Sequence, residues 1–211
     1  MSNSPDMSAL SNARIRALEE LRFTPVAVPW TREAGRLAGA LVGIALLAAV
    51  AAVVAGGARP QDIVARGGTI TALLGLAFVG GIAVIAPADA GARAWRACAL
   101  GAAPLVMVAL ALGRGAGLPS TTPPWVCSAS HFGLGLVPLW LALRGVRQAA
   151  WSWARALAAS VGAGTAGALL GELACHRGAA HVLVHHVGAW LVIALMGLWF
   201  SHRQTPRSFA P

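Results

Sequence analysis

Residues 35–58, GRLAGALVGIALLAAVAAVVAGGA, decide the fold class of this chain. After Arg36 the run contains no charged residue. It is long enough to cross a bilayer as a helix, which takes about 20 apolar residues. Its apolar residues are continuous rather than alternating, which favours a helix over a strand of a membrane barrel. The sequence therefore predicts a transmembrane helix here.

The rest of the 211-residue chain repeats this pattern. Its residues are 57% hydrophobic and only 11% charged, whereas a soluble domain carries about 25% charged residues. Mean hydropathy is +0.70. Five further apolar runs cover 68–86, 94–112, 131–143, 156–174 and 182–200. The run at 131–143 is short and needs residues 126–130 to complete its crossing. The sequence predicts an all-α, polytopic membrane bundle of six transmembrane helices.

The arginines predict how this bundle is oriented. All sixteen basic residues are Arg, and they give a net charge of +9. If the N-terminus is inside, twelve arginines fall in inner loops and tails and four in outer loops. Short cytoplasmic loops carry such an excess of basic residues. We therefore expect both termini in the cytoplasm, and we attribute the charge to orientation rather than to nucleic-acid binding.

The segment before the first span is the one sizeable polar part of the chain. We predict three regions: a cytoplasmic partner-binding segment at 1–34, a transmembrane domain at 35–200 and a cytoplasmic tail at 201–211. A helix that ends near Arg22 would place an apolar stripe on one face. Such a helix can lie on anionic lipid or bind in the groove of a partner protein. The candidate contact residues are Leu10, Arg14, Ala17, Leu18, Leu21 and Arg22.

Two of the predicted spans carry repeated glycines. Gly35, Gly39 and Gly43 follow one another at intervals of four in the first span, and Gly167 and Gly171 do so in the fifth. Such spacing is typical of closely packed membrane helices, so we expect both ridges to be packing faces. No charged residue falls near mid-membrane, which argues against a transporter or a channel.

Two groups of cysteine and histidine lie at the predicted outer end of the bundle. One is in WVCSASH, residues 125–131, and the other is in ELACHRGAAHVLVHH, residues 172–186. On an α-helix, residues four apart share a face. This pairs Cys127 with His131 and His181 with His185, and it separates His185 from His186. The candidate sensor residues are Cys127, His131, Cys175, His181, His185 and His186.

These residues allow three interpretations. Cys127, His131, Cys175 and His186 would form a tetrahedral metal site, with zinc as the candidate cofactor and copper(I) as a softer alternative. The two cysteines could instead form a structural or redox-active disulfide in an oxidising compartment. The third interpretation is interfacial histidines and buried cysteines with no joint role. The sequence shows no HExxH motif, phosphate loop or nucleophile with its base, so we do not expect an enzyme.

The six-span layout, the N-terminal stretch LEELRFTPVAVPWTREAGR at 18–36 and the outer cysteines Cys127 and Cys175 occur together. In these features the chain resembles the six-span membrane anti-sigma factors of the negative-regulator-of-sigma-F (NrsF) type, a group with CarR-like members. The resemblance implies a multi-pass protein of the bacterial inner membrane. The N-terminal segment would hold an extracytoplasmic-function sigma factor, and oxidative, metal or light-derived stress at the outer cysteines would release it. The alternative function is a small zinc-, copper- or haem-binding membrane protein without a sigma partner.

Overall fold

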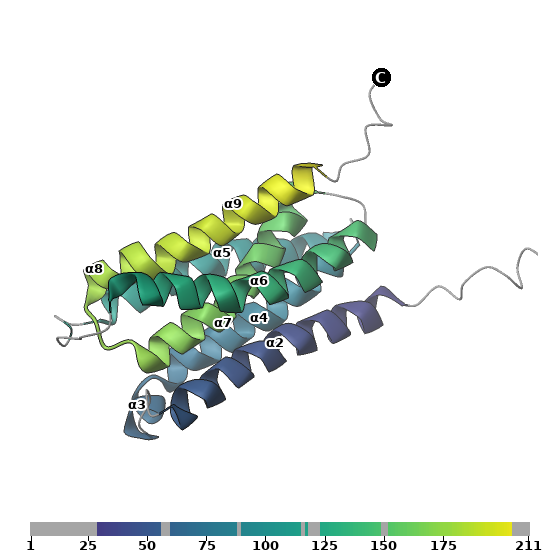
Figure 1. The fold of residues 1–211 in the computed structure, drawn as a ribbon. Helices are drawn as coiled ribbons and strands as arrows, with labels where there is room; N and C mark the ends of the chain where they lie inside the picture. Colours follow the sequence, from purple (N-terminus) through teal and green to yellow (C-terminus); the bar gives the residue numbers. More distant parts are fainter. Residues whose placement is uncertain are drawn as a thin grey trace, which may run out of the picture.

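The computed structural model describes residues 29–55, 60–87, 90–114, 117, 123–148 and 152–203. In this part of the chain, all the regular structure is helical apart from an isolated bridge between Gly117 and Arg177. The long helices, roughly aligned in Figure 1, are α2 (Trp30–Val54), α4 (Gly67–Ile85), α5 (Ala90–Leu112), α6 (Pro124–Gln148), α7 (Trp153–Ala174) and α9 (Gly188–Arg203). A short helix, α3 (Pro60–Ala65), precedes α4. A further turn, α8 (Ala179–His181), and a π-helix, η1 (Val182–Val187), lead directly into α9.

The predicted bundle of six membrane-spanning helices is confirmed. Six helical segments are long and apolar enough to cross a membrane, and α8, η1 and α9 together form the last of them, Ala179–Arg203. The start of α2 and the end of α9 lie at the same end of the bundle (Figure 1). The predicted partner-binding residues Leu10 to Arg22 lie outside the described residues. The cytoplasmic placement of both termini remains a prediction.

The expected extension of the fourth span is confirmed, because α6 begins at Pro124 and includes residues 126–130. The polar residues here do not end the helix, since the Ser130 hydroxyl donates to the carbonyl of Val126 at 2.8 Å. The first span, α2, begins at Trp30 rather than Gly35 and ends at Val54. Pro29, the N-cap residue, has a ψ of 130° and so lies outside the helical conformation, as N-cap residues do.

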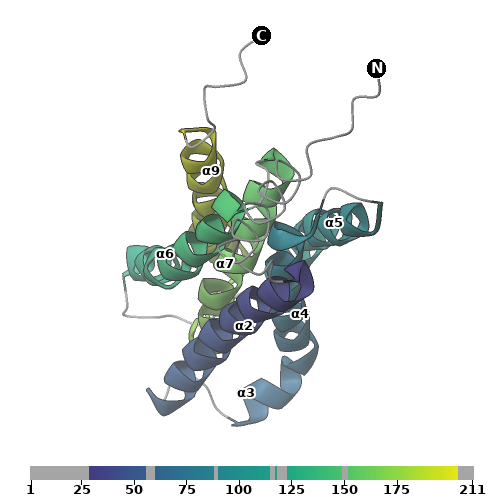
Figure 2. The same cartoon turned by 90° about the vertical axis from the view of Figure 1, so that its right-hand side faces the viewer.

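Helix α7 is the centre of the bundle. Of the residues in its apolar stretch 83% are buried, against 22–39% in the other five spans. It contacts α6 and α9 as well as α2 and α4, and Figure 2 shows it between these pairs. Its buried residues are mostly alanine and glycine, which let neighbouring helices approach closely. Helix α7 therefore packs against every other long helix of the bundle.

The expected glycine packing holds for α7 and is wrong for α2. A Cβ atom placed on Gly35, Gly39 or Gly43 would meet nothing within 4 Å. Helix α2 instead buries an alanine face that includes Ala38. A Cβ atom on Gly81 of α4 would lie 2.5 Å from the Cα atom of Ala38. The glycine that allows α2 and α4 to pack closely is therefore Gly81 of α4. The glycines of α2 do not take part in this contact.

The end of the bundle that holds both described chain ends is fastened by arginines. Arg96 of α5 donates to the carbonyl of Ala86, just after α4, at 2.9 Å. Arg155 of α7 donates to the same carbonyl at 2.7 Å. Cations stabilise the C-terminal ends of helices because the last carbonyls lack partners within the helix. These bonds join α4, α5 and α7 at this end.

Candidate functional site

Four of the predicted sensor residues converge at the opposite end of the bundle. Cys127, Cys175, His181 and His186 each offer one ligand atom, and these atoms all lie within 4.8 Å of one another. Cys127 comes from α6, Cys175 is the C-cap residue of α7, and the histidines come from α8 and η1. The prediction that the two Cys/His stretches meet at one end is therefore realised in the structure.

The π-helix η1 determines which histidines meet. A π-helix has i to i+5 hydrogen bonds and a wider turn than an α-helix; it is rare and frequently occurs at functional sites. The ring of His181 lies 5.6 Å from that of His186 and 4.6 Å from that of His185. α-Helical spacing predicted only the contact between His181 and His185. The wider turn adds the contact with His186.

His186 is buried against the central helix. Its ring lies where a side chain at Gly171 would have to be, so a Cβ atom there would overlap the imidazole. Only 6% of His186 is exposed. Its Nε2 atom is buried and has no hydrogen-bond partner within the described residues. Gly171 is thus the residue that makes room for a buried histidine at this site.

His131 lies close to the four residues but is not one of them. It is fully buried, and its ring is 5.9 Å from the ring of His186 and 6.3 Å from that of Trp190. A Cβ atom on Gly167 would lie 2.6 Å from its imidazole. The metal site predicted from the sequence included His131. In the structure, His181 joins the group instead. His131 packs one helical turn deeper than Cys127 on α6, behind the group.

His185 and His176 also lie outside the group. The Ser128 hydroxyl is 3.0 Å from Nδ1 of His185 and donates to its carbonyl at 3.3 Å. His185 therefore fastens η1 to α6. His176 is exposed on the loop after Cys175. Sequence reasoning did not assign a role to Ser128, although its place beside Cys127 was a signal that it faces this end.

A buried ion-pair network lies next to the group, and sequence reasoning missed it. Arg114, just after α5, contacts Glu172 of α7 with Nη2 to Oε2 at 2.7 Å, and Arg66 contacts the other carboxylate oxygen at 3.7 Å. Arg114 also donates to the carbonyl of Cys175. Charge-assisted bonds of this kind are short and directional. The network joins the start of α4 and the end of α5 to the backbone that carries Cys175. The sequence feature that could have indicated this network is Glu172, an acidic residue inside a predicted span, together with Arg66 and Arg114 in loops between spans.

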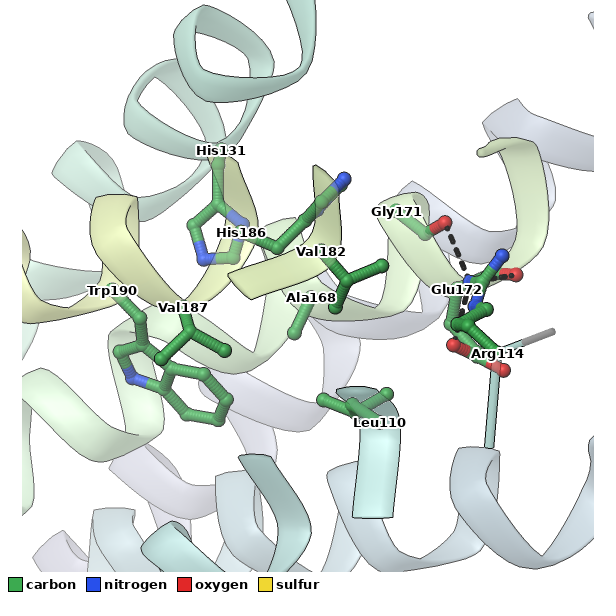
Figure 3. A pocket seen from close by; sticks show the side chains of 10 residues that line it. All are labelled: Leu110, Arg114, His131, Ala168, Gly171, Glu172, Val182, His186, Val187 and Trp190. Atoms are coloured by element: carbon green, nitrogen blue, oxygen red, sulfur yellow. Dashed lines mark hydrogen bonds and ion pairs between the residues drawn. The ribbon is translucent and has the colours of Figure 1, made fainter. Parts of the chain in front are cut away.

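A small cavity separates the histidines from this network. Figure 3 shows His131, His186 and Trp190 on one side of the cavity and Arg114 with Glu172 on the other. The other lining residues are Leu110, Ala168, Gly171, Val182 and Val187. The lining combines apolar side chains with imidazole nitrogens that lack partners. This end of the bundle therefore holds several polar groups inside an otherwise apolar core.

The third cysteine is separate from the site. Cys98 is exposed on α5, and the cysteines of the described chain form no disulfide. The exposure of Cys98 shows that it does not pack in the core of the bundle.

The chain is therefore a multi-pass membrane protein of six helices, with a Cys/His group at the end of the bundle away from both described chain ends. A comparison with curated proteins finds that the chain is 37% identical over 207 residues to the carotenogenesis protein CarR of Myxococcus xanthus. The match covers 98% of this chain and 92% of CarR.

The chain therefore belongs to the CarR family, which confirms its resemblance to CarR-like membrane anti-sigma factors. It is a multi-pass protein of the bacterial inner membrane. No family model matches the sequence, and no solved structure matches the fold.

Proposed function

We propose that the protein is an anti-sigma factor that holds an extracytoplasmic-function sigma factor at the membrane through residues 1–34. Stress at the outer Cys/His site releases the sigma factor, which then directs transcription. Because its relative is named for carotenogenesis, pigment synthesis is the response that we expect it to control. The observation that carries the proposal is the similarity to CarR along nearly the whole chain.

The convergence of Cys127 and Cys175 with two histidines supports the sensing part of the proposal. Thiolates and imidazoles are the protein groups that respond most readily to metals and oxidants. The site is also connected to the rest of the bundle through α7, which carries Cys175 at one end and Arg155 near the other. A change at Cys175 can therefore alter α7 along its length.

A signal across the membrane requires two states of the bundle that the outer site favours unequally. The structure suggests where they would differ, because α7 contacts all the other long helices. A small shift of α7 would change several helix contacts at once. The predicted N-terminal helix, which precedes α2, would respond through the contacts that α2 makes with α4 and α7.

The test of partner binding is co-purification from the native membrane. Deletion of residues 1–28 removes the predicted contact residues and leaves Pro29 and α2 intact. We expect the sigma factor to be lost from the purified protein and the activity of a sigma-dependent reporter to rise. The paired substitution Leu18→Asp and Leu21→Asp should act in the same way. Arg16→Ala, on the opposite face of the predicted helix, is the matched control. Undiminished co-purification with the deleted protein would refute the proposed interface.

A second candidate function is a small metal-binding membrane protein without a sigma partner. The four converging ligand atoms are the observation that favours it. The same purification distinguishes the two functions, because the second requires bound metal and no sigma factor. Neither function uses a catalytic group, and we do not propose an enzyme.

A further inference from the structure

We propose that Cys127, Cys175, His181 and His186 form a closed zinc site. Their ligand atoms already lie within 4.8 Å of one another. With Zn–S bonds of about 2.3 Å and Zn–N bonds of about 2.0 Å, a tetrahedral site separates its ligand atoms by about 3.3–3.8 Å. Ligand atoms at the upper limit of 4.8 Å need to approach one another by about 1–1.5 Å to complete the site.

The buried imidazole nitrogens favour a metal over a disulfide. Nε2 of His181 and Nε2 of His186 are both buried without a hydrogen-bond partner in the described part of the chain. An unsatisfied buried polar atom costs about 1–3 kcal/mol. A zinc ion bound by these nitrogens would remove that cost. A disulfide between Cys127 and Cys175 would leave both nitrogens as they are.

Charge balance favours zinc over copper(I). Two thiolates and two neutral imidazoles give the site a charge of −2, which Zn²⁺ cancels and Cu⁺ does not. A neutral site is the least costly to hold in the partly apolar end of a membrane bundle. The neighbouring carboxylate of Glu172 is already engaged by Arg114 and Arg66. It is therefore not a competing ligand.

Groups outside the ligand set support two of the ligands, Cys175 and His186. Arg114 binds the carbonyl of Cys175, Ser128 binds His185 in the π-helix beside His186, and Gly171 leaves space for the His186 ring. Metal sites depend on such supporting contacts for their geometry. Four protein ligands leave no open coordination position, which is typical of structural rather than catalytic zinc.

Zinc here would join α6 to the end of α7 and to the α8–η1 segment. Loss of the ion would free these elements from one another at the outer end. The regulatory meaning of that change rests on the proposed anti-sigma function, whereas the zinc assignment itself does not.

The test is metal analysis of the full-length protein, purified in detergent with a phosphine reductant after growth in zinc. We expect about one zinc per chain, and cobalt substitution should give the visible absorption of a tetrahedral thiolate site. Cys127→Ser, Cys175→Ser, His181→Ala and His186→Ala should each weaken zinc binding at least about tenfold. The matched controls are Cys98→Ser and His176→Ala, which remove the same residue types outside the group and should keep zinc.

Several results would overturn the assignment. These are a wild-type protein without zinc, stoichiometric copper in its place, a Cys127–Cys175 disulfide found by thiol labelling in intact cells, or equal zinc loss in the controls. Size-exclusion profiles report folding, and the near-isosteric Cys127→Ser variant keeps the test decisive if a histidine variant does not fold. Sigma co-purification is scored separately. Zinc without a sigma factor would refute only the proposed function, and a sigma factor without zinc would refute only the zinc site.

Discussion

Helices α2 and α7 both carry glycines four residues apart, but only the glycines of α7 pack against side chains of neighbouring helices. On α7, Gly164, Gly167 and Gly171 each make room for a ring, from Trp190, His131 and His186 in turn. On α2, a Cβ atom added at Gly39 would meet nothing within 4 Å. Small-residue spacing therefore shows where close packing is allowed, whereas the neighbouring side chains determine where it occurs. Substitution of these glycines by alanine measures that difference.

Gly164→Ala should have the largest effect. The new methyl group would overlap the indole of Trp190, which is 1% exposed and donates to the carbonyl of Ser160 at 3.1 Å. Overpacking of a rigid core costs about 1–3 kcal/mol, and we expect about 3 here because the ring has no space to move. The free energy of unfolding, measured by SDS titration in mixed micelles, checks this. A loss below about 1 kcal/mol would show that α7 and α9 are not in this contact.

Gly81→Ala should come next. The added Cβ atom would lie 2.5 Å from the Cα atom of Ala38, so the backbones of α2 and α4 must separate. We expect a loss of about 2 kcal/mol in the same SDS titration. An unchanged stability would mean that the alanine face of α2 does not pack on α4.

Gly171→Ala should cost about 1–2 kcal/mol, because the His186 ring can turn away from the new methyl group. That turn removes a proposed zinc ligand, so zinc binding should weaken at least about tenfold. Gly135→Ala is the matched control, since its added Cβ atom would overlap the buried Ile193 side chain, which is outside the ligand group. We expect a similar loss of stability in the control with zinc retained. Equal zinc loss in both variants would contradict the ligand set.

Gly39→Ala should have the smallest effect and the opposite sign. Its methyl group would enter open space, and alanine favours a helix over glycine by about 0.5–1 kcal/mol. We expect unfolding stability to stay equal or rise by up to that amount. A loss above about 1 kcal/mol would show that α2 contacts another surface through its glycines.

The sequence predicted the number of helices because continuous apolar runs need a bilayer whatever their neighbours are. It predicted that Cys127 and Cys175 meet, since an even number of crossings lies between the two loops that follow the third and fifth spans. It could not predict the face that α2 buries, because the alanines and the glycines of α2 are both small enough for close packing against a neighbouring helix. That choice depends on the contact between Gly81 and Ala38.

The ligand set was only partly predictable for a similar reason. α-Helical spacing paired Cys127 with His131, but α6 buries His131 against Gly167, deeper than the group. The same spacing could not bring His181 to His186, because that contact depends on the π-helix. A π-helix arises from tertiary packing and has no clear sequence signal. The ion pairs of Glu172 likewise depended on where the ends of α4 and α5 come to lie.

We propose that the outer site controls a sigma factor held on the other side of the membrane. The most direct test of this proposal is the amount of sigma factor retained on native membranes that carry Cys175→Ser, with His176→Ala as the neighbouring control. We predict that retention falls several-fold in the Cys175 variant, with a matching rise in sigma-dependent transcription, and stays at the wild-type level in the control. Equal retention in all three proteins, with or without the stress, would contradict the account.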